Sequence, residues 1–320
     1  MVPEQEQACP RARHKSKIGG QALIEGVMMR GVHKTAMAVR KPDQQIEVEV
    51  WENHTPKSSA GRVKRWPFVR GVFNMIESLT VGYRCLMKSA EISGADLEEE
   101  PTKFDLWLEK HFGDKLMKYV GWISGVLGVL LAIVLFMLVP SLIVWGLGFL
   151  FDVGIWRGLI EGVIKIGIFV GYMALVGKIP DMRRLYQYHG AEHKTIACFE
   201  AGEELTVENI RKYPRFHPRC GTSFIFLVLF LGILIFSVVT WSNPVIRTLL
   251  KLALLPVVVG IAYELIKLAG RYDNLFTKII SWPGLKLQHL TTKEPDGEQI
   301  EVAIESVKPV LPDNLEEDRW

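Results

Sequence analysis

Two histidines and a glutamate lie close together in a basic segment between two apolar stretches of the chain. The sequence His189-Gly190-Ala191-Glu192-His193 matches an H-x-x-E-H pattern. Apolar and histidine residues between Asp181 and Gly202 recur at helical spacing, which predicts a helix over 181–202. On this helix, two histidines four residues apart project from one face about one turn apart, which suits two ligands of a tetrahedral Zn²⁺. In inverted H-x-x-E-H metallopeptidases, the glutamate polarises a water held by the metal. The pattern therefore predicts a zinc site with His189 and His193 as ligands and Glu192 as the catalytic general base.

A second group of candidate ligands precedes the third apolar stretch, in the sequence His217-Pro218-Arg219-Cys220. Thiolate and imidazole groups suit zinc better than Mg²⁺ or Ca²⁺. The N-terminus of the helix predicted after Cys220, together with Arg219, favours the thiolate form of this cysteine. His217 and Cys220 would complete a shell of four ligands. A shell filled by four protein residues is typical of a structural metal, because a catalytic ion keeps one position for water.

Glu264 is the alternative third ligand if the site is hydrolytic. It lies near one end of the fourth apolar stretch, and a carboxylate within a spanning helix is a candidate for function. Lys267, three residues later, is a competing partner for its charge.

Two other interpretations of the cluster stay open. The two histidines of the H-x-x-E-H pattern could be core residues with backbone or carboxylate partners. Alternatively, Cys220 could be a nucleophile with His217 or His193 as its base.

The elements that must position these residues are apolar segments of membrane-spanning length. The chain has 320 residues, of which 49% are hydrophobic, and a net charge of +3. A spanning helix needs about 20 apolar residues. The stretches that meet this length are 120–151, 155–176, 222–241 and 245–269.

Prolines modify two of the apolar segments. Pro140 is expected to end the first span, which leaves 141–151 as an interfacial or re-entrant piece. Segment 279–285 contains Pro283 and is too short to cross a bilayer, so we expect it to lie at the interface.

Lys and Arg residues near the spans predict their orientation. The loop between the second and third spans holds eight of them, whereas the connections after the first and third spans hold one each, Arg157 and Arg247. The positive-inside rule then places both termini and the central loop in the cytoplasm. No cleaved signal peptide is expected, and the plasma membrane is the predicted location. Thiols on the cytoplasmic side stay reduced, so a disulfide framework is not expected for the four cysteines, Cys9, Cys85, Cys198 and Cys220.

Outside the spans, the two ends of the chain are expected to form a small cytoplasmic α+β domain. Segment 35–52 has the pattern of a hairpin that turns at residues 41–44, and 299–304 shows the same period-two alternation of a strand. The hypothesis from these patterns is that the strands at the two ends of the chain share one small sheet. Segment 67–91 carries apolar residues at helical spacing. It predicts an amphipathic helix, bent near Gly71 and Gly82, that lies on the membrane face or packs on the N-terminal domain.

The predicted organisation follows from these segments. It consists of a disordered N-terminus (1–17), a cytoplasmic α+β domain with the amphipathic helix (18–103), a lead-in helix with spans one and two (104–176), a cytoplasmic loop with the His/Glu/Cys cluster (177–221), spans three and four (222–270), an interfacial segment with a C-terminal strand (271–306) and an acidic, disordered tail (307–320).

Four segments carry a family likeness. They are 19–31 (GGQALIEGVMMRG), 188–194 (YHGAEHK), 217–222 (HPRCGT) and 283–295. In these segments, and from 18 to 304 as a whole, the chain resembles the YqhQ-like family of uncharacterised multi-pass bacterial membrane proteins. Members of that family are labelled predicted metal-dependent enzymes. The resemblance therefore implies a membrane protein with a metal site.

Together these observations predict an α-helical membrane protein with about four transmembrane helices and a zinc site at its cytoplasmic face. The leading hypothesis is a metal-dependent hydrolase or peptidase. The alternative is a non-enzymatic membrane scaffold or regulator, in which histidine and cysteine side chains clamp the central loop to the N-terminal domain. The lipid bilayer is the expected partner, with other membrane proteins under the alternative. Nothing in the sequence resembles a nucleic-acid-binding module.

Overall fold

The computed structural model describes residues 14–53, 66–94, 116–152, 154–237, 243–272 and 274–318. The chain divides into two compact units. The first unit consists of Met1–Ala95, Met173–Val228 and Val259–Trp320, and the second of Asp96–Tyr172 and Leu229–Val258. Most of the predicted lead-in helix, the extreme N-terminus and Cys9 lie outside the described residues.

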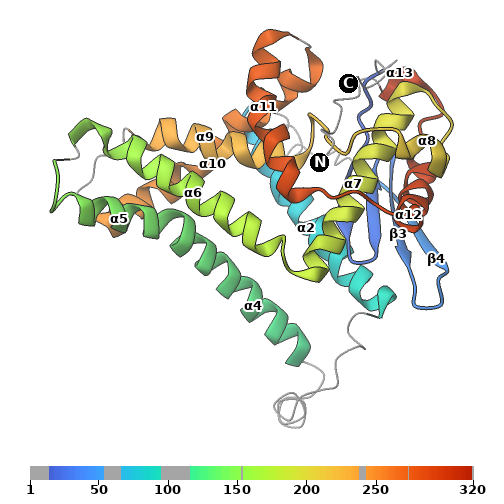
Figure 1. Ribbon diagram of the computed structural model, residues 1–320, viewed down its shortest axis with the longest axis horizontal. Helices are drawn as coiled ribbons and strands as arrows, with labels where there is room; N and C mark the ends of the chain where they lie inside the picture. Colours follow the sequence, from blue (N-terminus) through green and yellow to red (C-terminus); the bar gives the residue numbers. More distant parts are fainter. Residues whose placement is uncertain are drawn as a thin grey trace, which may run out of the picture. The chain divides into compact units, whose positions relative to one another are not determined.

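A four-stranded antiparallel sheet in the order β1-β2-β3-β4 forms the centre of the first unit (Figure 1). Its strands are β1 Gly19–Leu23, β2 Gly26–Arg30, β3 Lys34–Arg40 and β4 Ile46–Glu52. The hairpin predicted for 35–52 is confirmed, and Gln44 takes the left-handed conformation in its turn, with φ of 68°. The glycine-containing segment before it forms a second hairpin, which turns at Glu25 with φ of 50°.

Each face of the sheet is covered by helices. Val27, Met29 and Ala38 lie on one face, in the same core as residues of α7 (Pro180–Ala201) and α12 (Gly297–Val307). Met28 and Met37 lie on the other face and share a core with Cys85 of α2 (Val69–Ser93). The sheet is therefore the middle layer between α2 and the pair α7 and α12. Burying each large apolar side chain contributes about 1.5–3 kcal/mol.

β4 differs from the half-buried strand that its alternation predicts. Val48 and Val50 are 37% and 47% exposed, while Ile46 packs against the core shared with α12. β4 is an edge strand, and α12 covers mainly β2 and β3. The alternation thus correctly predicts a strand, although two of its apolar side chains are not covered by the described residues.

The strand predicted for 299–304 is wrong, because this segment forms α12. The Asp296 side chain accepts the N–H of Gln299, and the Gln299 side chain accepts the N–H of Asp296, which is a capping box. Ile300, Ala303 and Ile304 are buried at helical spacing. The pairing of this segment with the N-terminal strands, which the sequence pattern suggested, does not occur.

α2 is the amphipathic helix expected from the sequence, but Gly71 and Gly82 are positions where neighbouring segments pack closely against it. A Cβ atom at Gly71 would lie 2.6 Å from the Cβ of Tyr263, and one at Gly82 would overlap the side chain of Gln21. The helix therefore packs on the N-terminal domain, as one of the two interpretations held. Its outer face exposes a stripe of apolar side chains: Phe73, Ile76, Leu79, Tyr83 and Met87.

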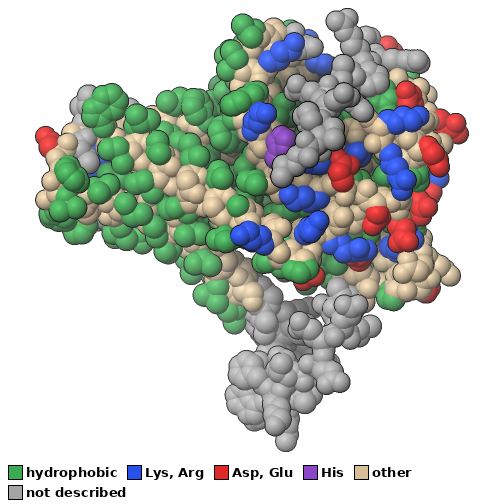
Figure 2. All heavy atoms as spheres, viewed as in Figure 1, with side chains coloured by type: hydrophobic (Ala, Val, Ile, Leu, Met, Phe, Trp, Pro, Cys, Tyr) green, Lys and Arg blue, Asp and Glu red, His purple; other side chains and the backbone are tan. Residues whose placement is uncertain are grey.

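Among the described residues, three helices are long and apolar enough to cross a membrane. They are Ile123–Leu147, Arg157–Val176 and Val245–Arg271. The helix expected as the third of four spans, α9 (Gly221–Ser237), has 17 described residues, and 238–242 are not described. Figure 2 shows hydrophobic side chains over α4 (Leu116–Ile133), α5 (Val139–Leu147) and α6 (Arg157–Val176), whereas Lys and Arg gather over α7 and α8 (Val207–Arg211). The protein is mostly helical and compatible with a membrane protein.

Pro140 does not end the first span, contrary to the expectation from sequence. The residues before it, Val134–Leu138, form a π-helical segment that joins α4 to α5. In this segment the N–H of Val139 bonds to the carbonyl of Val134, five residues back. The wider turn accommodates the proline ring and its missing N–H, which a regular α-helical turn does not. Residues 141–147 therefore continue the span instead of forming an interfacial piece.

Pro283 does not break the segment around it either. It lies inside α11 (Leu275–Thr291), which begins at a capping box formed by Asn274 and Thr277. This helix replaces the short 279–285 piece that the sequence suggested, and its placement at an interface stays a prediction.

The C-terminal tail, expected to be disordered, packs on the first unit up to residue 318. Asp318 is fully buried, and its side chain accepts the backbone N–H of Lys17 at 3.0 Å. The backbone N–H of Ser16 similarly reaches Glu200 at 2.7 Å. These contacts join residues that are 301 and 184 positions apart, and local composition carries no signal of such pairings.

Candidate metal site

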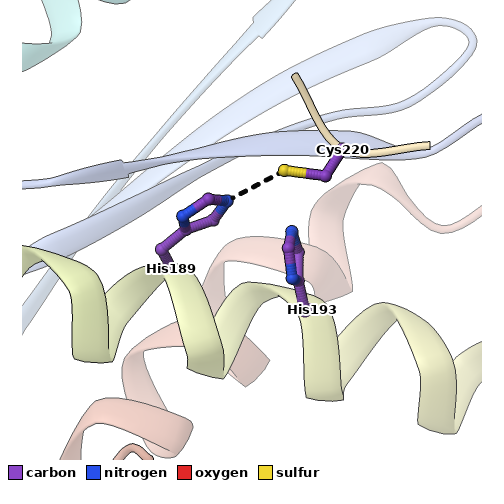
Figure 3. A group of neighbouring side chains, drawn as sticks. All are labelled: His189, His193 and Cys220. Carbon is purple, nitrogen blue, oxygen red and sulfur yellow. Dashed lines mark hydrogen bonds between the residues drawn. The ribbon is translucent and has the colours of Figure 1, made fainter. Parts of the chain in front are cut away.

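α7 positions the two histidines of the H-x-x-E-H pattern. The helix predicted for 181–202 is confirmed: it starts at Pro180 and ends before Gly202, which takes the left-handed conformation with φ of 71°. His189 and His193 project from one face of α7 toward Cys220 (Figure 3). Their ring centroids lie 4.4 Å apart. Cys220 directly precedes α9.

The three side chains form a compact group of candidate ligands. One ligand atom from each of His189, His193 and Cys220 lies within 4.8 Å of the other two. His189 Nε2 is 3.2 Å from Cys220 Sγ. His193 is 1% exposed and Cys220 is 8% exposed, whereas His189 is partly exposed, so the group is enclosed by protein except at His189.

Backbone carbonyls orient both imidazole rings. His189 Nδ1 lies 2.9 Å from the carbonyl oxygen of Thr291, and His193 Nδ1 lies 2.6 Å from that of Arg215. A carbonyl oxygen can only accept, so both Nδ1 atoms carry the proton that they donate. In the neutral rings the lone pair is then on Nε2. His193 Nε2 is buried and has no hydrogen-bond partner among the described residues.

The electrostatic environment favours a thiolate at Cys220. Burial acts to raise its pKa, but the neighbouring His193 and His189 bring it well below its usual value. The backbone N–H and the hydroxyl of Thr222 also point at Sγ, at 3.4 and 3.3 Å. In turn, burial acts to lower the pKa of His189, yet the Cys220 sulfur raises it to about 9. Without a metal, these two shifts favour a thiolate beside an imidazolium.

Glu192 lies on the side of α7 that contacts β1. A Cβ atom at Gly20 would lie 2.9 Å from Glu192 Cδ, so the absence of a side chain at Gly20 makes room for the carboxyl group. Glu192 is 5% exposed, and its Oε2 has no hydrogen-bond partner among the described residues. Burial raises the pKa of Glu192, against the opposing effect of the two histidines. A buried carboxyl group with a raised pKa near imidazoles suits a general acid or base.

His217 is close to the group but is not part of it. Its ring centroid is 5.6 Å from that of His193, whereas its Nε2 lies 3.3 Å from Arg219 Nη2 and 3.9 Å from Glu200 Oε2. Arg219 also pairs with Glu200. The structure therefore brings together three of the four ligands expected for a filled shell. Glu200, which the sequence did not single out, is the carboxylate next to His217.

The segment that carries His217 is fastened to α11. The backbone N–H and carbonyl of His217 both bond to the side-chain amide of Gln288, each at 2.8 Å. Gln288 is fully buried, and Thr291 near the end of the same helix bonds His189. No local pattern in the sequence identified these two positions.

The structure does not bring Glu264 to the candidate site. Its Oε1 lies 2.7 Å from Arg70 Nε, and the same carboxylate also accepts the backbone N–H of Phe68 at 3.3 Å. Arg70 is 194 residues away in the chain, so its pairing with Glu264 had no signal in the spacing that suggested Lys267. Ligation by Glu264 thus has no support in the geometry.

Comparison with known proteins places these segments in one family. The family described as "Protein of unknown function (DUF1385)" matches residues 66–313, which include α7 and Cys220. The chain is also 37% identical over 296 residues to the "Uncharacterized protein YqhQ" of Bacillus subtilis (strain 168), and the match covers 92% of each chain. No solved structure matches the chain. The family match over most of its length, together with this relative, shows that the chain belongs to the DUF1385 family that the sequence resemblance indicated.

Proposed function

We propose that this protein binds a zinc ion through His189, His193 and Cys220 and catalyses a metal-dependent hydrolysis. The observation that carries the proposal is the orientation of the two imidazoles. Both donate Nδ1–H to a backbone carbonyl, which leaves the Nε2 lone pairs beside a cysteine sulfur. Zinc-ligating histidines have this arrangement, because the second nitrogen is held by a carbonyl or carboxylate.

The number and type of the ligands support a catalytic ion. Two imidazoles and one thiolate match the donor types of zinc, and three protein ligands leave a fourth position. His217, the fourth candidate from sequence, is instead engaged with Arg219 and Glu200. A zinc ion held in this way supplies a Lewis acid that activates water near neutral pH.

Glu192 has the properties of the proton acceptor in such a site. Its carboxyl group is buried, and one of its oxygens is without a hydrogen bond among the described residues. Both histidines and Cys220 influence its pKa, which supports a position near the proposed ligands. Its role in the proposal is to take a proton from the attacking water and pass it to the leaving group.

The proposed location is the cytoplasmic side of the plasma membrane. Three long apolar helices support membrane insertion, and the Lys and Arg residues between α6 and α9 support a cytoplasmic position for α7. The proposed substrates are peptides or lipid-linked molecules that reach the site along the membrane.

Metal analysis of the detergent-purified full-length protein tests the proposal. We expect about one zinc per chain in the wild type, and its loss in His189→Ala, His193→Ala and Cys220→Ser. His33→Ala is the matched control, because His33 is exposed and pairs with Glu317 far from the ligands in sequence. Stable, well-folded wild-type protein that neither contains nor takes up zinc would contradict the metal site.

A non-enzymatic scaffold is the second candidate, and the burial of the group favours it. With His193 only 1% exposed, a metal here has little access to solvent. Glu192→Gln separates the two functions when it is introduced into the chromosomal gene. A catalytic base should lose biological function while zinc content and thermal stability persist, whereas a structural site should tolerate the change.

A further inference from the structure

A cluster of buried charges in the second unit takes no part in the proposed zinc site. Glu161 and Lys165 lie in α6, and Arg247 and Lys251 lie in α10 (Pro244–Arg271). Their exposed fractions are 3%, 7%, 2% and 1%. Both helices are apolar enough to cross a membrane, and ionisable groups in such helices are costly and commonly functional.

One carboxylate serves two of the cations. Lys251 Nζ contacts Glu161 Oε1, and it lies 3.2 Å from the hydroxyl of Ser141 in α5. That hydroxyl donates to the same carboxylate oxygen at 2.9 Å. Arg247 Nη2 lies 2.9 Å from the other oxygen, Oε2. Both oxygens of Glu161 therefore face cations, although Oε2 makes no hydrogen bond among the described residues.

Positive charge remains in excess after this pairing. Lys165 has no ion pair among the described residues and lies 5.4 Å from the ring centroid of Phe236. Arg247 Nε and Nη1, like Nε of Arg157, are buried and make no hydrogen bond within the described part of the chain. Segment 229–258, including its undescribed part, contains no Asp or Glu. Burying an unpaired cation is strongly unfavourable, so these donors indicate a missing anion.

The unpaired groups converge on a cavity. Lys165, Arg247 and Lys251 line it, and glycines of α6 and α9, Gly158, Gly162 and Gly232, form part of its wall. A Cβ atom at Gly162 would lie 2.5 Å from Ile233, so the helices approach closely beside the cavity. The cavity as it stands, about 10 Å³, has room for about one water molecule. We propose that it widens to bind a phosphate group, held by the ammonium of Lys165 and by the guanidinium N–H groups of Arg247 that have no partner among the described residues.

The chemistry of the donors favours phosphate over a simple halide. A guanidinium offers N–H groups in a fixed plane that match two oxygens of an oxyanion, and an ammonium adds a compact charge. Three buried cations against one carboxylate leave a surplus that matches the charge of a phosphate group, about −1 to −2.

The phosphate could belong to a lipid headgroup or be free inorganic phosphate. Lys165 is about 12 Å along the helix from the first residue of α6, at 1.5 Å per residue, and Arg247 and Lys251 lie in the first two turns of α10. In the proposed topology these helix starts face the outer leaflet, and Lys165 lies in the outer half of the bilayer, below the level of the lipid phosphates. This argument for a lipid rests on the proposed membrane placement, whereas binding of inorganic phosphate does not.

Thermal unfolding of the full-length protein tests the site in two arms. The first arm adds inorganic phosphate to protein in a neutral detergent. The second compares nanodiscs of phosphatidylcholine with nanodiscs that also contain phosphatidylglycerol. We expect wild-type protein to be stabilised in at least one arm, and Lys165→Met to bind the phosphate group about tenfold or more weakly. Lys165→Arg should restore binding, and Lys178→Met, an exposed lysine beyond the other end of α6, should leave it unchanged.

The outcomes separate the sources and can overturn the site. Stabilisation by phosphatidylglycerol alone identifies a lipid headgroup, and stabilisation by inorganic phosphate identifies a free anion. Without either ligand, Lys165→Met should be at least as stable as wild type, because it removes an unpaired buried charge. Lys165→Gln repeats the comparison if the methionine variant does not purify. No stabilisation of wild type in either arm, or equal stabilisation of the Lys165 variants, would show that the cavity is not a phosphate site.

Discussion

The ring nitrogen that carries the proton in His189 and in His193 decides what the group of His189, His193 and Cys220 can do. A core histidine satisfied on both nitrogens would be inert, whereas here His193 Nε2 is buried with no hydrogen-bond partner among the described residues. The residue types and the spacing of four were visible in the sequence. The acceptors, the backbone carbonyls of Thr291 and Arg215, were not visible in the sequence, because every residue type has a backbone carbonyl.

His217 is predicted to make the metal-free protein sensitive to acid. Burial lowers the pKa of His217, although Glu200 acts in the opposite direction. The unfolded chain therefore binds the proton more tightly, so this stability is present above about pH 6.5 and is lost as the pH falls below it. Glu200, whose pKa is lowered by His217 and Arg219 against the effect of burial, adds a further loss only below about pH 4.5.

Thermal unfolding of chelator-treated protein between about pH 7 and 5 measures this effect. The slope for one proton is at most about 1.4 kcal/mol per pH unit. His217→Gln should flatten the dependence on pH, and His33→Gln, an exposed histidine, should not. An equal slope in wild type and His217→Gln would rule out His217 as the group responsible.

At the level of elements, the sequence predicted a segment correctly where its apolar residues fit the period of a helix or that of a strand, but not both. The α7 segment fits only a helical period, and the helix was predicted within two residues at each end. Segment 299–304 fits both a strand and a helix, since Ile300, Val302 and Ile304 alternate while Ile300, Ala303 and Ile304 also share a helix face. The capping box at Asp296 and Gln299 was the signal that would have decided for α12.

Gly190 is predicted to hold α7 against the segment after α11. A Cβ atom at this position would overlap the carbonyl oxygen of Lys293, two residues after the Thr291 that orients His189. Gly190→Ala should therefore destabilise the protein by about 1–3 kcal/mol, as overpacking does, and should reduce zinc content. The control is Gly128→Ala in α4, where no atom lies within 4 Å of an added Cβ. Thermal unfolding and metal analysis of both variants check this, and a Gly190→Ala protein with wild-type values would refute it.

At the level of the whole molecule, the apolar spans were predictable and the site was not. Hydropathy is a local property, so three of the four expected spans appear as helices of sufficient length. The site, in contrast, joins segments that are distant in sequence. The bond between His189 and Thr291 links positions 102 residues apart, and the bonds between His217 and Gln288 link positions 71 apart. Glu264 was misassigned for the same reason, since Arg70 approaches it from the other end of the first unit's sequence.

The exposed stripe of α2 is an apolar surface outside the helices of spanning length. Ile76, Leu79 and Tyr83 are 51%, 65% and 55% exposed, and exposed apolar stripes of this kind mark contact with a membrane or a protein. The start of α2 packs on α10, where Gly71 meets Tyr263 and Arg70 pairs with Glu264. Because that part of α10 belongs to an apolar span, the start of α2 is held at membrane level in the proposed topology. We therefore expect the stripe to lie in the lipid interface.

Site-directed fluorescence in nanodiscs tests this placement. A polarity-sensitive probe on Leu79→Cys should emit at shorter wavelength in lipid than in detergent-free buffer standards, and a nitroxide attached to lipid should quench it. The same probe on Asp43→Cys, in the exposed turn between β3 and β4, should remain unquenched. Cys85 and Cys198 are buried, and burial raises their pKa, that of Cys198 to about 11, so neither should label under mild conditions. Equal quenching at the two probe positions would place the stripe in water and leave it as a surface for another protein.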